Sequence, residues 1–223
     1  MAIDSFAARH LDPGTRMGEI LFGLIMTLTF TLGAGLMLEE EGREGARQLL
    51  IATAGCNLAW GIIDGVFHVL DRLFERGRLR KLAIDVRSST SDADARRFVG
   101  EELDPALVRV TEASFRAGLY DSIVKRIRTE DVPPPVRVRR DDLLGGLAGG
   151  WLVFACSFPA AVPFLFIDEP RLALRISNAV LLVLLFIVGH RVARHTMARP
   201  WLTGFVFVLA GLVLVAAAIA LGG

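Results

Sequence analysis

The sequence predicts an all-α integral membrane protein, with five transmembrane helices and a helical cytoplasmic insert between helices 2 and 3. Of the 223 residues, 53% are hydrophobic and 22% are charged, and the mean hydropathy is +0.50. Most of the charged residues lie between positions 71 and 142. The remainder contains five apolar runs of about 20 residues, the length that a helix needs to cross a bilayer core. This composition excludes a soluble enzyme, a disordered chain and a secreted disulfide scaffold.

The five apolar runs place the expected spans at residues 18–38, 49–70, 143–167, 172–190 and 201–222. Acidic residues from Glu39 onward end the first span, and Asp71 directly follows the second. Pro159 and Pro163 are expected to bend the third span, because proline removes a hydrogen bond from the helix backbone. Arg171 bounds the short fourth span. We therefore expect three regions, with 1–70 and 141–223 carrying the spans and 71–140 forming the insert.

The distribution of basic residues predicts the orientation of the chain. The N-terminus, the 72–140 segment and the turn after the fourth span together hold 21 of the 25 Lys and Arg residues. Basic residues near span ends remain on the cytoplasmic side, so the N-terminus and the insert are expected there and the C-terminus outside. The segment from Ile3 to Leu11 places apolar residues at helical spacing, which predicts an interfacial helix on the same surface.

Helix signals also recur within the insert. The second span is expected to continue as a helix through about Arg87. Ser91 with Asp94 resembles a capping box that opens a helix through about Leu103. Asp104-Pro105 indicates a new helix start, and Thr111 is placed to cap a helix that ends near Arg128. Three consecutive prolines from Pro133 then predict a stiff connector.

Ionisable residues inside the spans indicate where chemistry takes place, because a charge near the bilayer centre is costly. Asn57, Asp64 and His68 of the second span share one helical face with Asp71. Gly61 and Gly65 flank this face and would let another helix approach closely. The first span adds Glu19 near its cytoplasmic end.

Together these side chains predict a metal site, with Met26, two turns beyond Glu19, as a further ligand. The complete candidate set is Glu19, Met26, Asn57, Asp64 and His68. Carboxylate, imidazole, amide and thioether donors suit Fe²⁺ or Mn²⁺ better than Ca²⁺ or Mg²⁺. Protons and metal would compete for the same carboxylate oxygens.

Each of these residues also has a structural interpretation. His68 and Asp71 are equally consistent with contacts to lipid headgroups. Asp64 is compatible with an interhelical hydrogen bond or an arginine pair, Glu19 with a solvated carboxylate, and Met26 with simple packing.

Several stretches resemble the vacuolar iron transporter family, of which the chain would be a divergent bacterial-type member. RMGEILFGLIMTLTFTLGAG is similar to that family's first span, with Glu19 at the position of its acidic residue. SFPAAVPFLF resembles the end of its third span, and ALRISNAVLLVLLFIVGHRVAR with GFVFVLAGLVLVAAAIALGG resembles its last two spans. The resemblance implies a homodimer that moves Fe²⁺ or Mn²⁺ out of the cytoplasm in exchange for protons.

Two functions remain open from the sequence. The first is a proton-coupled divalent metal transporter that exports Fe²⁺ or Mn²⁺ from the cytoplasm. The second is a non-transporting membrane scaffold that keeps the five-helix fold and binds a soluble partner through its insert. An enzyme is not expected, because the chain has no HExxH, GxSxG or phosphate-binding loop. The expected partners are membrane lipid, the transported ion and protons, without a tightly bound cofactor.

The charge pattern and the composition indicate which partners and which location to expect. Basic and acidic residues alternate through the polar segment, so a nucleic acid partner is not expected. The absence of targeting signals and the Arg- and Ala-rich composition favour a bacterial inner membrane.

Overall fold

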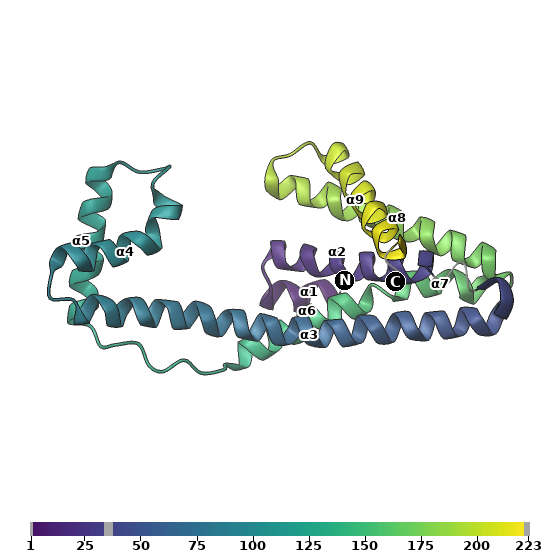
Figure 1. Cartoon of the computed structure of the whole chain (residues 1–223), viewed down its shortest axis with the longest axis horizontal. Helices are drawn as coiled ribbons and strands as arrows, with labels where there is room; N and C mark the ends of the chain where they lie inside the picture. Colours follow the sequence, from purple (N-terminus) through teal and green to yellow (C-terminus); the bar gives the residue numbers. More distant parts are fainter. Residues whose placement is uncertain (1, 34–37, 221–223) are drawn as a thin grey trace. The chain divides into compact units, whose positions relative to one another are not determined.

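The structure, a computed structural model, describes residues 2–33 and 38–220, and every regular element within these ranges is an α-helix (Figure 1). The helices are α1 (Ala2–His10), α2 (Pro13–Gly33), α3 (Leu38–Ser88), α4 (Asp92–Leu107), α5 (Ala113–Thr129), α6 (Arg140–Ala155), α7 (Phe158–Phe166), α8 (Pro170–Thr196) and α9 (Pro200–Ala220). Contacts divide the chain into two compact units. We name Met1–Val69 with Arg140–Gly223 the bundle unit, and Leu70–Arg139 the insert unit.

Five helical segments of the described chain are long and apolar enough to cross a membrane. They are Pro13–Gly33, Gly42–Ser88, Arg140–Phe166, Pro170–Thr196 and Pro200–Ala217. The prediction of an all-α protein with five such helices is therefore confirmed. Expected span residues 34–37, 221 and 222 lie outside the described residues.

The first span begins at Pro13, earlier than expected, because Asp12 caps the helix. Asp12 Oδ1 accepts hydrogen bonds from the backbone N–H groups of Gly14 (2.9 Å) and Thr15 (3.1 Å). An aspartate at this position satisfies backbone donors that have no partner within the helix. Hydrogen bonds from the Thr15 hydroxyl and backbone hold the pKa of Asp12 below its usual value.

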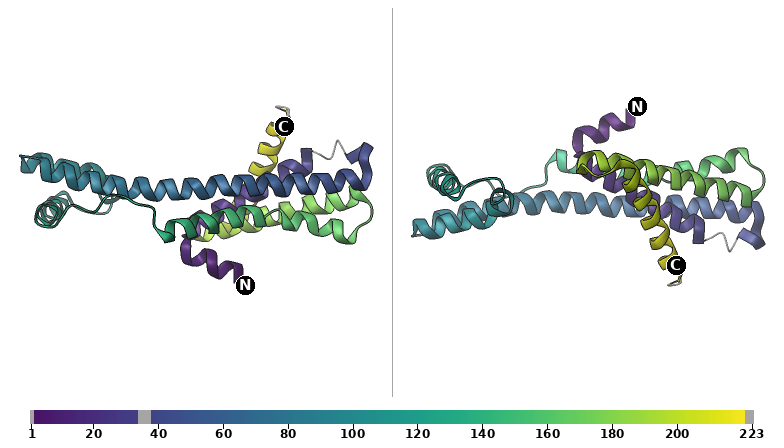
Figure 2. Two further views of the ribbon diagram at one scale, coloured as in Figure 1. Left: turned by 90° about the horizontal axis from the view of Figure 1, so that it is seen from below. Right: turned by 90° about the horizontal axis from the view of Figure 1, so that it is seen from above.

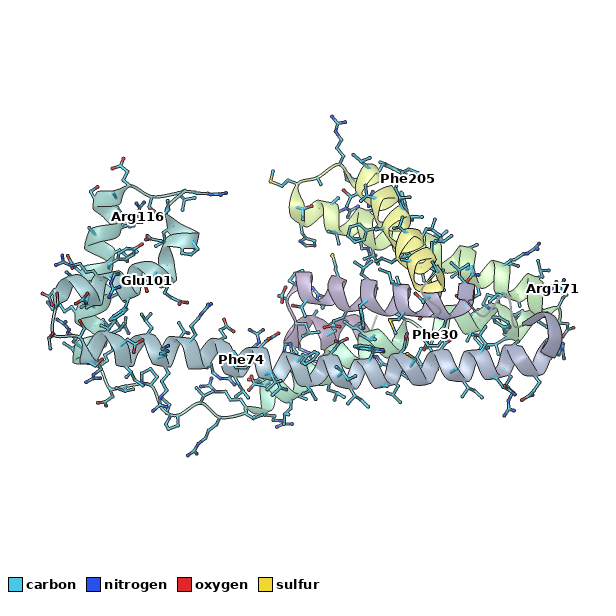
Figure 3. The ribbon with its side chains drawn as sticks, viewed as in Figure 1. Phe30, Phe74, Glu101, Arg116, Arg171 and Phe205 are labelled. Carbon is cyan, nitrogen blue, oxygen red and sulfur yellow. The ribbon has the colours of Figure 1, made fainter. Side chains whose placement is uncertain are left out.

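The core of the bundle unit forms where α2, α8 and α9 meet. Its fully buried members include Leu24 and Leu28 of α2 and Leu181 and Leu185 of α8. Helix α9 turns back from the end of α8 and crosses it obliquely (Figure 2). At the other end of α2, Phe30 packs against a cluster that includes Leu49 and Leu174 (Figure 3).

Paired glycines bring the backbones of α3 and α6 into direct contact. A Cβ at Gly61 would lie 2.5 Å from the carbonyl oxygen of Gly150, and one at Gly146 would lie 2.5 Å from that of Gly65. Such distances leave no room for a side chain at this crossing. The expected close approach at Gly61 and Gly65 is therefore confirmed, and α6 is the helix that approaches.

The third span is interrupted between α6 and α7. Helical structure stops at Ala155 and resumes at Phe158, with Pro159 in the first turn of α7. Proline is favoured in a first turn because its missing N–H would have no partner there. In place of a bend at Pro159 and Pro163, the structure has a break at Cys156 and Ser157, just before α7, and Pro163 lies inside α7.

Helix α1 packs against α6 through its apolar face. Ala7 and Leu11 are buried in a cluster with Ala148 and Leu152 of α6. The helix predicted from Ile3 to Leu11 is confirmed from Ala2 to His10. Ala7 of this helix and Leu11 directly after it contact protein, which the expectation of a helix lying on the lipid surface did not include.

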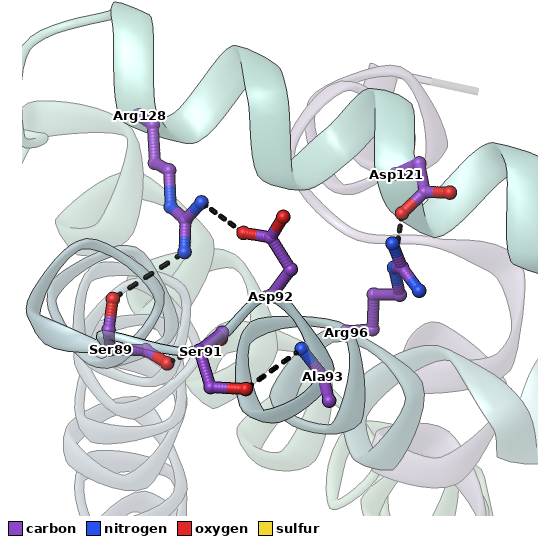
Figure 4. Close-up of polar contacts among 7 residues, drawn as sticks. All are labelled: Ser89, Ser91, Asp92, Ala93, Arg96, Asp121 and Arg128. Atoms are coloured by element: carbon purple, nitrogen blue, oxygen red, sulfur yellow. Dashed lines mark hydrogen bonds and ion pairs between the residues drawn. The ribbon is translucent and has the colours of Figure 1, made fainter.

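The insert unit has a small core of its own where the end of α3 meets α4 and α5. Val86, Ala95, Val99, Tyr120 and Val124 form this core. Arg128 pairs with Asp92, and Arg96 pairs with Asp121, across α4 and α5 (Figure 4). Ser91 accepts a hydrogen bond from the Ala93 N–H (3.2 Å), so its predicted role as an N-cap is confirmed.

One expected helix start and one expected cap in the insert unit were wrong, although the helix expected to end near Arg128 is confirmed as α5. Pro105 lies inside α4 instead of opening a new helix, since the helix continues to Leu107. In the last turn, proline removes only one backbone hydrogen bond and does not have to end the helix. Thr111 does not cap α5, because Glu112 is the N-cap residue and the Thr111 hydroxyl donates to Leu107 O (2.7 Å).

Candidate functional site

Asn57 joins three helices of the bundle unit at a fully buried position. Its side-chain amide nitrogen lies 2.9 Å from Thr27 Oγ1, 3.2 Å from Val153 O and 3.3 Å from Gly23 O. These acceptors belong to α2 and α6, whereas Asn57 belongs to α3. An amide NH₂ has two hydrogens, so the three acceptors share them. The nitrogen of Asn57 therefore ties α2, α3 and α6 together.

The amide oxygen of Asn57 has a different environment. Asn57 Oδ1 is buried and has no hydrogen-bond partner among the described residues. An unpaired buried acceptor is destabilising unless a donor or a cation reaches it. The atom of Asn57 that can bind a cation is thus the atom that the protein leaves unpaired.

Glu19 of α2 and Asp64 of α3 place two carboxyl groups in the same part of the bundle unit. They are close enough for the charge of Asp64 to act on Glu19. Asp64 Oδ2 is buried without a hydrogen-bond partner in the part of the chain that the structure describes. Glu19 is half-buried, and its Oε1 would lie 3.5 Å from a Cβ at Gly149 of α6. The absent side chain of Gly149 therefore leaves space for the carboxylate of Glu19.

His68 lies one turn beyond Asp64 and contacts α6 in the same way. Its imidazole occupies the position that a Cβ at Gly145 would take. Gly145 and Gly149 are one turn apart, so they present neighbouring spaces on one face of α6. That face accommodates His68 and Glu19, while Gly146 and Gly150 contact the backbone of α3.

Asp142 is a buried acidic residue of α6 that sequence analysis did not select as a candidate. It lies in the first turn of α6 and is only 4% exposed. The sequence places it at an expected helix start, where an acidic residue has an ordinary structural explanation. Its spacing from Gly145 and Gly149 is the signal that identifies it, because all three share one face of α6.

The structure does not bring the five predicted metal ligands together. Glu19 and His68 contact the glycine-lined face of α6, Asp64 lies near Glu19, and Asn57 lies two turns along α3 from Asp64. Met26 is half-buried on α2, about 10 Å along the helix axis from Glu19. Within residues 2–33 and 38–220, no three His, Cys, Asp or Glu side chains are placed to hold a metal ion together. The described residues thus provide a pair of carboxyls with an imidazole nearby, without a closed cage.

Comparisons with known proteins assign no family to the chain, so a function has to be argued from the geometry described above. No protein-family model matches the chain, and no curated protein matches it at significant similarity. The class of protein follows from the fold alone, as five helices long and apolar enough to span a membrane indicate an integral membrane protein.

Proposed function

We propose that the protein is a proton-coupled transporter that exports a divalent transition-metal ion, Fe²⁺ or Mn²⁺, from the cytoplasm. The observation that carries the proposal is the carboxyl pair of Glu19 and Asp64 on helices that are apolar enough to span a membrane. No arginine or lysine pairs with either carboxyl among the ion pairs found in the described residues. A mobile cation is the partner that such a site lacks.

The carboxyl pair also supplies a reason for proton coupling. Two ionised carboxylates carry the charge that balances one divalent cation, and two protons balance them equally well. In a low-dielectric site, two ionised carboxylates without a bound cation are unfavourable. Metal and protons are therefore expected to replace each other. One metal ion leaving for two entering protons moves no net charge, so the exchange is electroneutral.

An open ligand set is compatible with transport. A site that passes an ion must bind it well enough to admit it and weakly enough to release it. Carboxylate oxygens of Glu19 and Asp64 are donors that Fe²⁺ or Mn²⁺ accepts, and the imidazole of His68 would bind the ion at a neighbouring position along its path. Asn57 Oδ1 would receive the ion further along α3.

A flux assay in proteoliposomes tests the proposal. With a metal-sensitive dye inside and a pH gradient imposed, we expect the wild type to move Fe²⁺ or Mn²⁺ and the Glu19→Gln and Asp64→Asn variants to lose this flux. Glu75→Gln, an exposed acid on α3, is the matched control and should transport normally. An imposed membrane potential should leave the rate unchanged. Absence of flux for every divalent ion tested, in correctly folded protein, would reject transport.

The scaffold remains a second candidate function because the insert unit exposes apolar side chains. Val108, Val110 and Phe115 are 51%, 76% and 61% exposed around the turn between α4 and α5. Exposed apolar groups that are close together mark contact surfaces for other proteins. In this case wild-type proteoliposomes would show no flux, and Val110→Ser with Phe115→Ser would abolish binding of a soluble partner.

A further inference from the structure

A second site in the bundle unit lies apart from the carboxyl pair. A cavity of about 700 Å³ opens between α1, α2, α6, α7 and α8. Its apolar wall includes Ile20, Leu24, Leu152, Leu184, Ile187 and Val188. Three nitrogen-bearing side chains, Arg16, Arg191 and His195, line it as well. No Asp or Glu is among the described residues that line it.

The polar and apolar parts of the cavity are arranged along its length. Arg16 lies in the first turn of α2, and Leu24 lies about 12 Å deeper along the same helix. Arg191 lies near the end of α8, and Leu184 lies about 10 Å back from it. The start of α2 and the end of α8 therefore form one basic end, from which an apolar channel about two turns long extends into the bundle.

Arg16 has a hydrogen-bond donor that is free to bind an anion. Its Nε is buried and has no hydrogen-bond partner among the described residues. A guanidinium has five N–H donors and no acceptor, and its geometry matches phosphate and carboxylate oxygens. With no acidic residue in the described lining, the buried Nε of Arg16 is available to an anion from outside the chain.

We propose that this cavity binds one anionic phospholipid, with its phosphate on Arg16 and Arg191 and one acyl chain along the apolar wall. An inorganic anion would leave the apolar channel unfilled, and a zwitterionic lipid would bring a cationic group to the arginines. Cavities of a few hundred to about 1,000 Å³ are typical of small-molecule sites. The expected orientation places the basic end at the cytoplasmic leaflet. The proposal does not depend on the proposed transport function.

Native mass spectrometry of the full-length protein in neutral detergent tests the proposal. With phosphatidylglycerol and phosphatidylcholine added in equal amounts, we expect one retained phosphatidylglycerol per chain. Loss of both arginines in the Arg16→Gln, Arg191→Gln double variant should weaken retention roughly tenfold or more, because charged hydrogen bonds to the phosphate are lost. Arg194→Gln is the matched control, since this exposed residue of α8 does not line the cavity.

A second variant separates a lipid from the other possible occupants. Ile187→Trp adds bulk to the apolar wall and keeps both arginines, so it should also reduce retention. Inorganic phosphate in excess should not displace the lipid. Equal retention of phosphatidylcholine, displacement by phosphate alone, or loss of a dimer instead of a lipid on Ile187→Trp would each overturn the proposal.

Discussion

Asn57 shows how a single side chain serves both architecture and chemistry. Its amide nitrogen holds α2 and α6 against α3, and its amide oxygen is left buried and unpaired. Lipid is as apolar as the helix surfaces, so the hydrophobic effect does not drive membrane helices together. Interhelical hydrogen bonds and close packing therefore determine how they associate. Asn57 is thus part of the framework that holds Glu19 and Asp64 near each other.

Replacement of Asn57 should weaken the bundle. We expect Asn57→Ala to lower the free energy of unfolding by about 1–2 kcal/mol, because three acceptors lose their shared donor. Thr29→Val is the control, since the Thr29 hydroxyl donates only to Ile25 O of its own helix (2.9 Å) and should contribute little. Unfolding by SDS titration, followed by circular dichroism, measures both. Equal stability of the two variants would contradict this role of Asn57.

Tyr120 gives the insert unit a dependence on pH that can be observed directly. Its hydroxyl donates to Asp104 Oδ1 (2.6 Å), and this hydrogen bond raises the pKa of Tyr120 above its usual value, with burial adding to the effect. A raised pKa means that the folded state holds the proton more tightly. The resulting stability is present below about pH 10 and is lost as the pH rises through the folded-state pKa.

Ultraviolet titration will report on Tyr120 alone, because it is the chain's single tyrosine. We expect a midpoint above that of free tyrosine in the wild type and a lower midpoint in Asp104→Ala. Asp121→Ala, which removes an exposed carboxylate from the same helix as Tyr120, should leave the midpoint unchanged. A wild-type midpoint at the free value would disprove the hydrogen bond.

At the scale of elements, the glycine crossing of α3 and α6 positions the candidate site. Gly61 and Gly65 contact Gly150 and Gly146, so the two backbones touch. The close approach brings His68 against Gly145 on the next part of the same face. The candidate site therefore requires small residues on both helices. Larger residues at the crossing would move α3 and α6 apart and separate the side chains of the site.

A methyl group at the crossing should be destabilising. In Gly61→Ala the new Cβ meets the Gly150 carbonyl oxygen at 2.5 Å, so α3 and α6 must separate. We expect a loss of about 1–3 kcal/mol, as for other overpacked contacts. Gly55→Ala lies on the same helix with open space around its Cβ, and it should be neutral or more stable by up to about 1 kcal/mol. SDS unfolding that ranks the two variants in reverse would rule out the crossing.

At the scale of the whole molecule, the orientation in the membrane is the prediction with most consequence for function. The proposed export assumes that the start of α2 and the end of α8 face the cytoplasm. The basic residues favour this orientation, because 21 of the 25 lie in segments that it places inside.

Cysteine labelling tests the orientation in intact cells. In a Cys56→Ser, Cys156→Ser background, a membrane-impermeant maleimide should label the Glu44→Cys variant at once. The Ser122→Cys variant, in the insert unit, should react only after permeabilisation. Both positions are exposed, so accessibility within the fold does not limit labelling. Immediate labelling of Ser122→Cys with protection of Glu44→Cys would invert the topology and the direction of transport.

The sequence by itself determined the number of membrane helices, the helical continuation of the second span and the glycines of α3 that allow close approach. These features depend on composition and on the helical period, which fix which residues share a face. The sequence also selected Glu19, Asp64 and His68, since polar residues in apolar runs are conspicuous. It was wrong about a helix start at Pro105 and about Thr111 as the cap of α5, where neighbouring packing and backbone bonds outweighed local signals.

Only the tertiary structure decided which helix faces which. It identified α6 as the partner of Gly61 and Gly65, buried Asp142 in the first turn of α6, and formed the cavity at Arg16. The physical reason is that lipid is as apolar as the helix surfaces, so hydrophobicity does not distinguish one partner helix from another. That choice depends on shape and hydrogen bonds between residues distant in the chain, such as Asn57 and Val153.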